Sequence, residues 1–132
     1  MKNNTSVSKQ TEYAEYKLEK GILHLCYTDG LNLTLEIARQ TVQDRVEFLQ
    51  GKSYPMLVDD RGLITIEREA GVFYSTEEAG SCILAVAIVT RSKFTLFFAR
   101  FYLIMHPAPA GIPVKLFSNE DVLFSTGPFP RK

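Results

Sequence analysis

The sequence predicts a single α/β domain with a mostly parallel sheet and an antiparallel hairpin at its N-terminal end. Two observations lead to this fold class. From about residue 34 onward, strand-like apolar runs alternate with helix-like segments, which is typical of parallel strands joined by right-handed crossovers. Ahead of them, residues 12–28 form two β-type runs separated by a turn signal. We expect the domain to cover residues 12–125, between a disordered polar N-terminus at 1–11 and a C-terminal tail at 126–132.

The first elements follow from their turn and cap residues. Lys20-Gly21 separates the two β-type runs, and glycine supplies the positive φ that a tight hairpin turn needs. Thr34 is a suitable N-cap for a helix that Gly51 would end. A single apolar stripe at helical spacing supports this helix, made by Leu35, Ala38, Val42, Val46 and Leu49.

The second half of the chain continues the alternation of strands and helices. Its clearest buried strand is at 83–89, a continuous apolar run rich in β-branched side chains. A helix at 92–105 is expected to stop before Pro107. The other predicted elements are a strand at 56–59, a weak helix at 66–74, a strand at 112–117 and a short helix at 119–124.

The composition is that of a folded globular protein, with 45% hydrophobic and 23% charged residues among 132. The 15 acidic and 15 basic residues cancel, and lysine and arginine do not cluster, so we expect no nucleic-acid partner. The most hydrophobic segment, 94–105, is shorter than the roughly 20 residues of a membrane-spanning helix. We therefore expect no membrane span.

The cysteines and histidines predict neither a metal site nor a cofactor site. Cys26 and Cys82 form no C-x-x-C pair, and His24 and His106 are isolated along the chain. The sequence also contains no glycine-rich phosphate loop and no nucleophile elbow. Because the polar start contains no apolar targeting segment, we expect a reduced, cytoplasmic protein.

The predicted elements follow one another in the order of a hairpin and then βαβαβα. Three segments belong to this order: L-V-D-D-R-G at 57–62, A-V-A-I-V at 85–89 and I-P-V-K-L-F at 112–117. With this order, the chain resembles the small bacterial SpoIIAA-like proteins of the STAS superfamily over about residues 12–125. The resemblance implies a βα superhelix and a protein that binds partners rather than catalysing a reaction.

The resemblance also marks one place where this sequence departs from its relatives. Anti-sigma-factor antagonists of the superfamily have an Asp-Ser-Ser-Gly-like motif at the start of the helix after the third strand, and one serine is phosphorylated. In this chain that place falls at 67–70, which contains no serine, and Thr65 is the nearest hydroxyl. We therefore expect no regulation by serine phosphorylation at this place.

Asp59, Asp60 and Arg61 are candidate ligand or docking residues, because they follow a predicted strand and ligands of α/β sheets gather at the carboxyl ends of strands. Two carboxylates in different environments would also suit general acid and base catalysis. However, adjacent residues that leave a strand point apart. The interpretation that we favour is structural: Asp59 accepts hydrogen bonds from loop amides, while Asp60 and Arg61 are solvated.

The helix predicted at 92–105 is apolar on nearly its whole circumference, which is typical of a helix buried on more than one side. Phe97 and Ile104 fall within the polar wedge marked by Lys93 and Arg100. We take Phe97, Arg100 and Ile104 as candidate interface residues of a homodimer. Neighbouring helices or an apolar ligand would bury the same face.

Three classes of function remain open. We favour a non-catalytic interaction module of the STAS or SpoIIAA-like type. The alternative is a carrier of a lipid or small apolar ligand, similar to the CRAL-TRIO domains, and the third class is an enzyme that uses Asp59 or Asp60. A contiguous apolar cavity beneath 94–105 would favour the carrier, and a pocket that holds Asp59 beside another titratable group would favour the enzyme.

Overall fold

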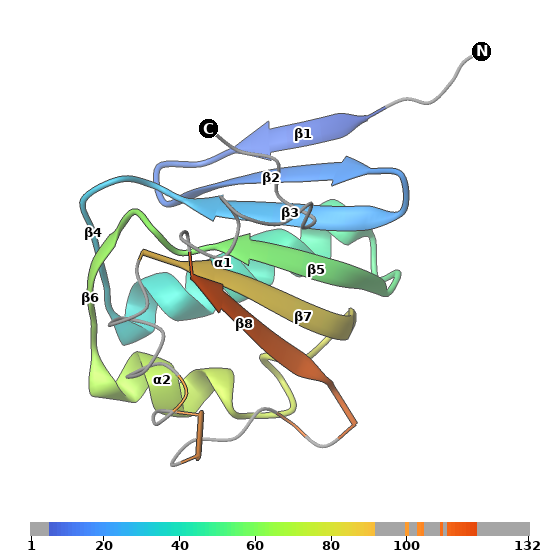
Figure 1. Ribbon diagram of the computed structural model, residues 1–132. Coiled ribbons are helices and arrows are strands. Elements are labelled where there is room, and N and C mark those ends of the chain that lie inside the picture. The colour runs from blue at the N-terminus through green and yellow to red at the C-terminus, as the bar shows by residue number, and fades with distance from the viewer. Residues whose placement is uncertain (1–5, 92–99, 101–102, 105–108, 110, 119–132) are drawn as a thin grey trace.

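The computed structural model describes residues 6–91, 100, 103–104, 109 and 111–118 (Figure 1). These residues form one mixed α/β domain built on a six-stranded sheet with the order β1-β2-β3-β5-β7-β8. The strands are β1 (Val7–Gln10), β2 (Ala14–Glu19), β3 (Ile22–Tyr27), β5 (Tyr54–Asp59), β7 (Ile83–Thr90) and β8 (Val114–Ser118). Strand β2 pairs antiparallel with both β1 and β3. The strands β3, β5, β7 and β8 are parallel, so the β2–β3 hairpin and the parallel part of the sheet agree with the prediction from the sequence.

Two helices and a second, smaller sheet complete the domain. The helices are α1 (Leu35–Leu49) and α2 (Arg68–Tyr74), and the small sheet pairs β4 (Leu31–Leu33) with β6 (Leu63–Ile66). Each strand of this small sheet leads directly into one of the helices. As a result α1 and α2 start side by side and contact each other.

The hairpin and the first helix are formed by the residues that the sequence identifies. Lys20 and Gly21 have φ values of 55° and 75°, as a tight primed turn between β2 and β3 requires. The hydroxyl of Thr34 accepts a hydrogen bond from the amide of Ile37 at 3.2 Å, which confirms the predicted N-cap of α1. The left-handed residue that ends this helix is Gln50, one position before the predicted Gly51.

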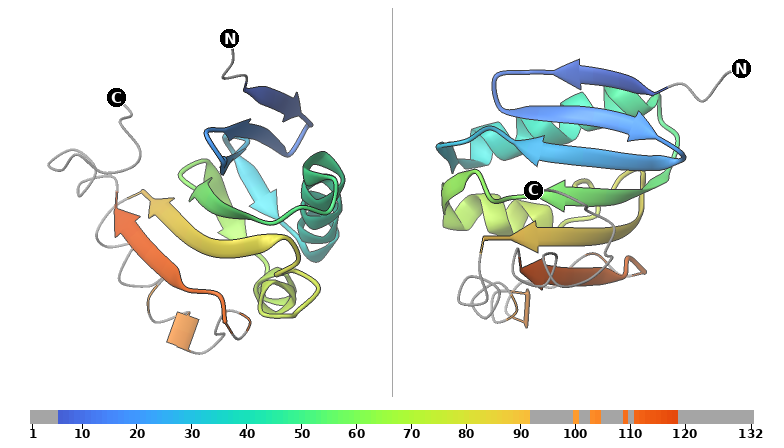
Figure 2. Two further views of the ribbon diagram at one scale, coloured as in Figure 1. Left: turned by 90° about the vertical axis from the view of Figure 1, so that its right-hand side faces the viewer. Right: turned by 45° about the horizontal axis from the view of Figure 1, so that its top comes forward.

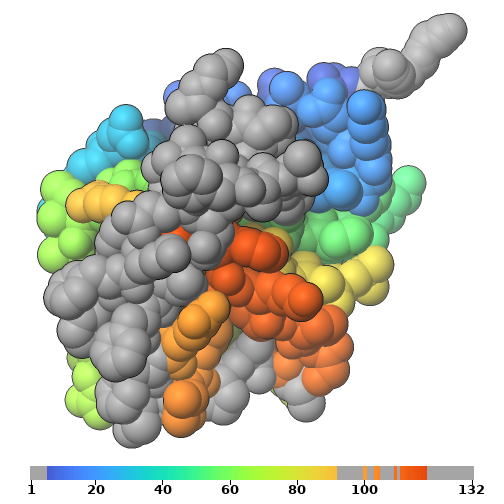
Figure 3. Space-filling model, viewed as in Figure 1, coloured from blue at the N-terminus to red at the C-terminus, as the bar shows by residue number. Residues whose placement is uncertain are grey.

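Both helices cover the same face of the sheet, as the edge-on view in Figure 2 shows. The main core lies between this face and the helices and includes the fully buried Tyr16 and Leu23. On the opposite face, side chains of β2, β5, β7 and β8 reach the surface (Figure 3). There Leu57 and Val89 are the buried members of a smaller cluster. The larger hydrophobic core is therefore on the helix side.

The structure differs from the prediction at several boundaries. Val7–Gln10, expected in a disordered segment, form β1 at the edge of the sheet, because backbone hydrogen bonds to β2 hold a strand whose side chains stay mostly exposed. Strand β8 starts at Val114 rather than at 112, since Pro113 has no amide for the ladder. The helix expected at 119–124 and the tail at 126–132 lie outside the described residues.

Candidate functional site

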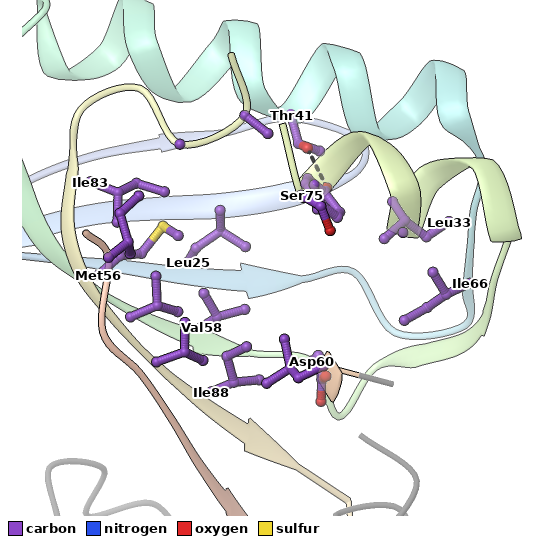
Figure 4. Close-up of a pocket in the computed structure, with 18 of the residues that line it drawn as sticks. Leu25, Leu33, Thr41, Met56, Val58, Asp60, Ile66, Ser75, Ile83 and Ile88 are labelled. Carbon is purple, nitrogen blue, oxygen red and sulfur yellow. Dashed lines mark hydrogen bonds between the residues drawn. The ribbon is translucent and has the colours of Figure 1, made fainter. Parts of the chain in front are cut away.

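A cavity of about 480 Å³ lies between the helix-covered face of the sheet and the two helices (Figure 4). Its volume is within the range of small-molecule sites. Most of its wall is apolar, and the large sheet contributes Leu25, Met56, Val58, Ile83, Val86 and Ile88. The wall continues to Leu103, Pro109 and Ile112 beside β8. The sheet residues meet in this wall because alternate side chains of a strand point to one face of a sheet.

Three hydroxyl groups form a hydrogen-bonded chain in the polar part of the wall. The hydroxyl of Tyr74 lies 3.0 Å from that of Tyr27 and 2.9 Å from Oγ1 of Thr41. Burial raises the pKa of Tyr27 well above its ordinary value and also raises the pKa of Tyr74. Both phenols are therefore neutral at physiological pH.

The direction of this hydroxyl chain follows from its last member. Thr41 donates its single hydroxyl proton to the carbonyl of Ala38 at 2.8 Å. Tyr74 must then donate to Thr41, and Tyr27 must donate to Tyr74. The oxygen of Tyr27 is left with lone pairs at the cavity wall, so it can accept a hydrogen bond there.

Arg45 of α1 is the one arginine among the described residues that line the cavity, and only 3% of its surface is exposed. Its Nη2 donates to the carbonyl oxygens of Ala79 at 2.6 Å and Ser81 at 2.9 Å. Its Nε is buried and has no hydrogen-bond partner in the part of the chain that the structure describes. No carboxylate of the described residues forms an ion pair with it. Burial lowers the pKa of Arg45, yet an arginine stays cationic at neutral pH.

Asp60 also lines the cavity, directly after β5 (Figure 4). Removal from water and then the neighbouring charge of Asp59 raise its pKa to about 7. Because Asp60 lines the cavity and is only partly exposed, the expectation that it is solvated is wrong. The physical reason is alternation: Met56 and Val58 of β5 face the cavity, and the residue two positions further points to the same side.

Asp59 faces away from the cavity and is only 4% exposed. Its Oδ1 accepts hydrogen bonds from the amide of Arg61 at 3.1 Å and from Nε of Arg61 at 2.9 Å, and its Oδ2 lies 2.7 Å from Nη2. The predicted loop-amide bond to Asp59 is thus present. The expectation that Arg61 is solvated is wrong, because its guanidinium forms a two-point ion pair with this carboxylate.

Gly62 completes the same turn because no larger residue fits. A Cβ at this position would lie 2.9 Å from the carbonyl oxygens of Tyr27 and Thr28 and from the carboxylate of Asp29. The segment D-D-R-G therefore packs tightly against the loop that follows β3. Within this segment Asp59 is held by Arg61, and Asp60 lines the cavity.

Comparison with known proteins identifies the family of this chain. Residues 16–122 match the model of a family described as Domain of unknown function, DUF7793. The chain belongs to the DUF7793 family. No curated protein matches it.

The architecture of the DUF7793 chain is also found in a solved structure. An uncharacterized protein of the DUF3478 family from Shewanella loihica PV-4, which has a SpoIIAA-like fold, matches with a TM-score of 0.52. The two proteins are 18% identical, and the match covers 93% of this chain and 96% of that one. At this identity the likeness shows the fold alone. The DUF7793 chain thus has the SpoIIAA-like fold that the sequence predicts.

Within this fold, the place expected for the phosphorylated serine is acidic. Glu67 is the N-cap residue of α2, and its Oε1 accepts a hydrogen bond from the amide of Leu35 at the start of α1, at 2.8 Å. The hydroxyl of Thr65 donates to the side chain of Asn32 at 2.7 Å. The absence of serine phosphorylation here stays a prediction.

The structure describes two of the three candidate interface residues, Arg100 and Ile104. Phe97 lies outside the described residues. Arg100 and Ile104 are exposed, Ile104 by 76%, whereas Leu103 turns toward the cavity. Among the helices that the structure describes, none is long and apolar enough to cross a membrane.

Sequence reasoning missed the polar groups of the cavity: Tyr27, Thr41, Arg45 and Tyr74. A signal for Arg45 was present, since it lies one helical turn after Thr41 and one turn before the buried Leu49. An arginine inside the buried stripe of a helix is uncommon enough to indicate a site.

Proposed function

We propose that this DUF7793 protein is a non-catalytic binding protein that holds a small, mainly apolar molecule between its sheet and its helices. The observation that supports the proposal is the cavity of about 480 Å³, whose apolar wall extends to Leu103 and Pro109. Such a contiguous cavity is what distinguishes an apolar-ligand carrier from a module that binds proteins through its surface. This favours the carrier among the classes left open by the sequence.

A catalytic role receives less support from the same geometry. The carboxylate of Asp59 is held by Arg61 and does not line the cavity, so Asp59 and Asp60 do not face a common reacting atom. Neither Cys26 nor Cys82 forms a disulfide among the described residues, which supports a reduced compartment such as the cytoplasm as the place of action.

A series of straight-chain alkanols tests the binding proposal, because these probes are apolar and differ only in tail length. Each added methylene that enters the cavity contributes about 0.8 kcal/mol, so the Kd measured by calorimetry should fall about fourfold per carbon until the cavity is full. Failure of every alkanol to bind would overturn the proposal.

Two variants of β7 locate the binding. Val86 lines the cavity and its neighbour Ala87 belongs to the cluster on the opposite face of the sheet. Val86→Phe fills the cavity and should weaken alkanol binding by roughly tenfold or more. Ala87→Leu enlarges the other face and should change it less than about twofold. Equal effects of the two substitutions would place the probe elsewhere. Thermal unfolding checks that both variants stay folded.

We also propose that the protein forms a homodimer through a surface that includes Arg100 and Ile104. Ile104 is the most exposed of the large hydrophobic residues in the described part of the chain, and Arg100 lies one turn before it. Phe97 would extend the same contact. A stable interface should bury roughly 1,000 Å² or more.

Sedimentation at high micromolar concentration tests this contact. Ile104→Glu and Phe97→Glu should shift the protein toward monomer, whereas Ile64→Glu, an exposed isoleucine of β6, should not. A wild-type protein that sediments as a monomer would rule the dimer out.

A further inference from the structure

Arg45 is a cation on the wall of an otherwise mainly apolar cavity. Its side chain is almost fully buried, and among the described residues it forms no ion pair. A buried charge without a counter-ion is unfavourable unless something else compensates it. The cavity beside it is where a compensating group would fit.

The bonds that Arg45 forms within the protein account for its position but not for its charge. Two carbonyl oxygens, of Ala79 and Ser81, accept hydrogen bonds from Nη2, and they fix the guanidinium against the segment before β7. A neutral amide would serve two carbonyls equally well. The positive charge and the buried Nε have no partner among the residues that the structure describes.

The nearest charged neighbour in the sequence does not supply that match. Asp44 precedes Arg45 on α1, but its Oδ1 accepts a hydrogen bond from the side-chain amide of Gln40 at 2.9 Å. Adjacent helical residues point about 100° apart, so a direct pair between them is geometrically unfavourable.

Asp60, the acidic group of the cavity, lies at the other end of the strands. Arg45 contacts the residues just before Ile83, where β7 begins, whereas Asp60 follows the carboxyl end of β5. Because β5 and β7 are parallel, with Tyr54 beside Ile83 and Asp59 beside Val89, these two ends are separated by most of the strand length. An anion at Arg45 would therefore be remote from Asp60.

We propose that the ligand is a monocarboxylate with an apolar tail, held by its carboxylate at Arg45. The tail lies along β7, past Val86 and Ile88, toward Asp60. From Ile83 to Ile88 the strand rises by roughly 17 Å, which is room for a medium-length alkyl chain. This inference rests on the proposed function, since it assigns the head group of the molecule that the cavity holds.

Decanoate and decanol test the head group, because they share a tail length and differ in charge. For the wild-type protein at neutral pH, the Kd of decanoate should be lower than that of decanol by roughly tenfold or more, as a charge-assisted hydrogen bond predicts. In Arg45→Met this preference should disappear, through weaker binding of decanoate and little change for decanol. Arg45→Lys keeps a cation in place and should keep part of the preference.

The outcomes separate this inference from the proposed function. Equal binding of both probes by wild type and by Arg45→Met would overturn the carboxylate and leave the apolar cavity standing. Failure of both probes in the wild type would overturn both proposals. Loss of both probes in Arg45→Met, with an intact circular dichroism spectrum, would show that Arg45 only shapes the cavity, and would overturn the inference.

A second readout needs no variant. Decanoate labelled with ¹³C at its carboxyl carbon reports its own titration by NMR when bound to the wild-type protein. Next to the guanidinium of Arg45 the pKa of the carboxyl should fall below that of free decanoate. A raised pKa would place the head group in the apolar part of the cavity and overturn the inference.

Discussion

The guanidinium groups of Arg61 and Arg45 are both at least partly removed from water, and they differ in the groups that each contacts. Arg61 forms a two-point ion pair with the buried carboxylate of Asp59 at 2.7 and 2.9 Å. Arg45 is more deeply buried, yet it meets two carbonyl oxygens and a cavity. The charge of Arg61 thus has a counter-ion within the fold, whereas under our proposal the charge of Arg45 is available to a ligand.

The largest effect is expected where the fold uses a charge. Asp59→Ala removes the acceptor of three hydrogen bonds from Arg61, and we expect it to lower the free energy of unfolding by about 2–4 kcal/mol. The estimate is below the full cost of breaking a buried pair because Arg61 is partly exposed. Urea unfolding at pH 7 measures the change.

A surface pair provides the control for Asp59. Lys17 and Glu19 lie 3.7 Å apart with both side chains exposed, so Glu19→Gln should change stability by less than about 0.5 kcal/mol. If Asp59→Ala had an effect as small as this, the ion pair with Arg61 would not distinguish the two arginines.

A smaller, pH-dependent effect is expected from Asp60. Its pKa rises from 3.8 in the unfolded chain to about 7 in the folded protein, so the native state binds more protons between these values. The stability contributed by the protonated carboxyl is complete below about pH 4 and is lost as the pH rises through 7. Asp60→Asn should remove this loss and be more stable than wild type by about 1–3 kcal/mol at pH 8.

Urea unfolding of wild type and Asp60→Asn from pH 5 to pH 8 tests this expectation. The difference between the two proteins isolates Asp60 from other titrating groups. Two parallel stability curves would show that Asp60 is solvated, as expected from the sequence, and that it does not belong to the cavity wall.

The hydroxyl chain should contribute less, and unequally. Tyr74 both accepts from Tyr27 and donates to Thr41, so Tyr74→Phe leaves the hydroxyl of Tyr27 without its acceptor and that of Thr41 without its donor, and should cost about 1–2 kcal/mol. Tyr27→Phe removes the first donor of the chain and should cost about 0.5–1 kcal/mol. Thermal unfolding orders the two variants, and the reverse order would contradict the assigned direction.

The sequence predicted the elements that long patterns or specific turn residues define. The hairpin at Lys20-Gly21, the helix that Thr34 caps and the apolar strand β7 all appear as expected. It missed β1 and the β4–β6 sheet because such short strands have too few residues to show a period. These strands exist through pairing with partners that are distant in the sequence.

The site was predicted less well, for a geometric reason. Sequence placed Asp59, Asp60 and Arg61 at the end of a strand, but whether each side chain faces the cavity, the solvent or a partner depends on the sheet that surrounds it. Arg45 was passed over because a helical stripe was defined by its apolar members. Neighbours from the segment before β7 decide what this arginine meets, and they lie more than 30 positions away.

The smallest effect provides the most direct test of the comparison between the two arginines. In protein freed of ligand, Arg45→Met should change the free energy of unfolding by less than about 1 kcal/mol. The loss of two hydrogen bonds to carbonyl oxygens is offset by removal of an unmatched buried charge, and unbranched methionine fills similar space. Arg61→Met, by contrast, should cost about 2–3 kcal/mol, since it leaves the carboxylate of Asp59 buried without its cation.

Urea unfolding at pH 7 measures the costs of Arg45→Met and Arg61→Met. The same experiment is repeated with decanoate, which should stabilise wild type more than Arg45→Met. If the two substitutions had equal costs and decanoate did not distinguish Arg45→Met from wild type, then Arg45 would be a structural anchor like Arg61, and the cavity would hold no anion.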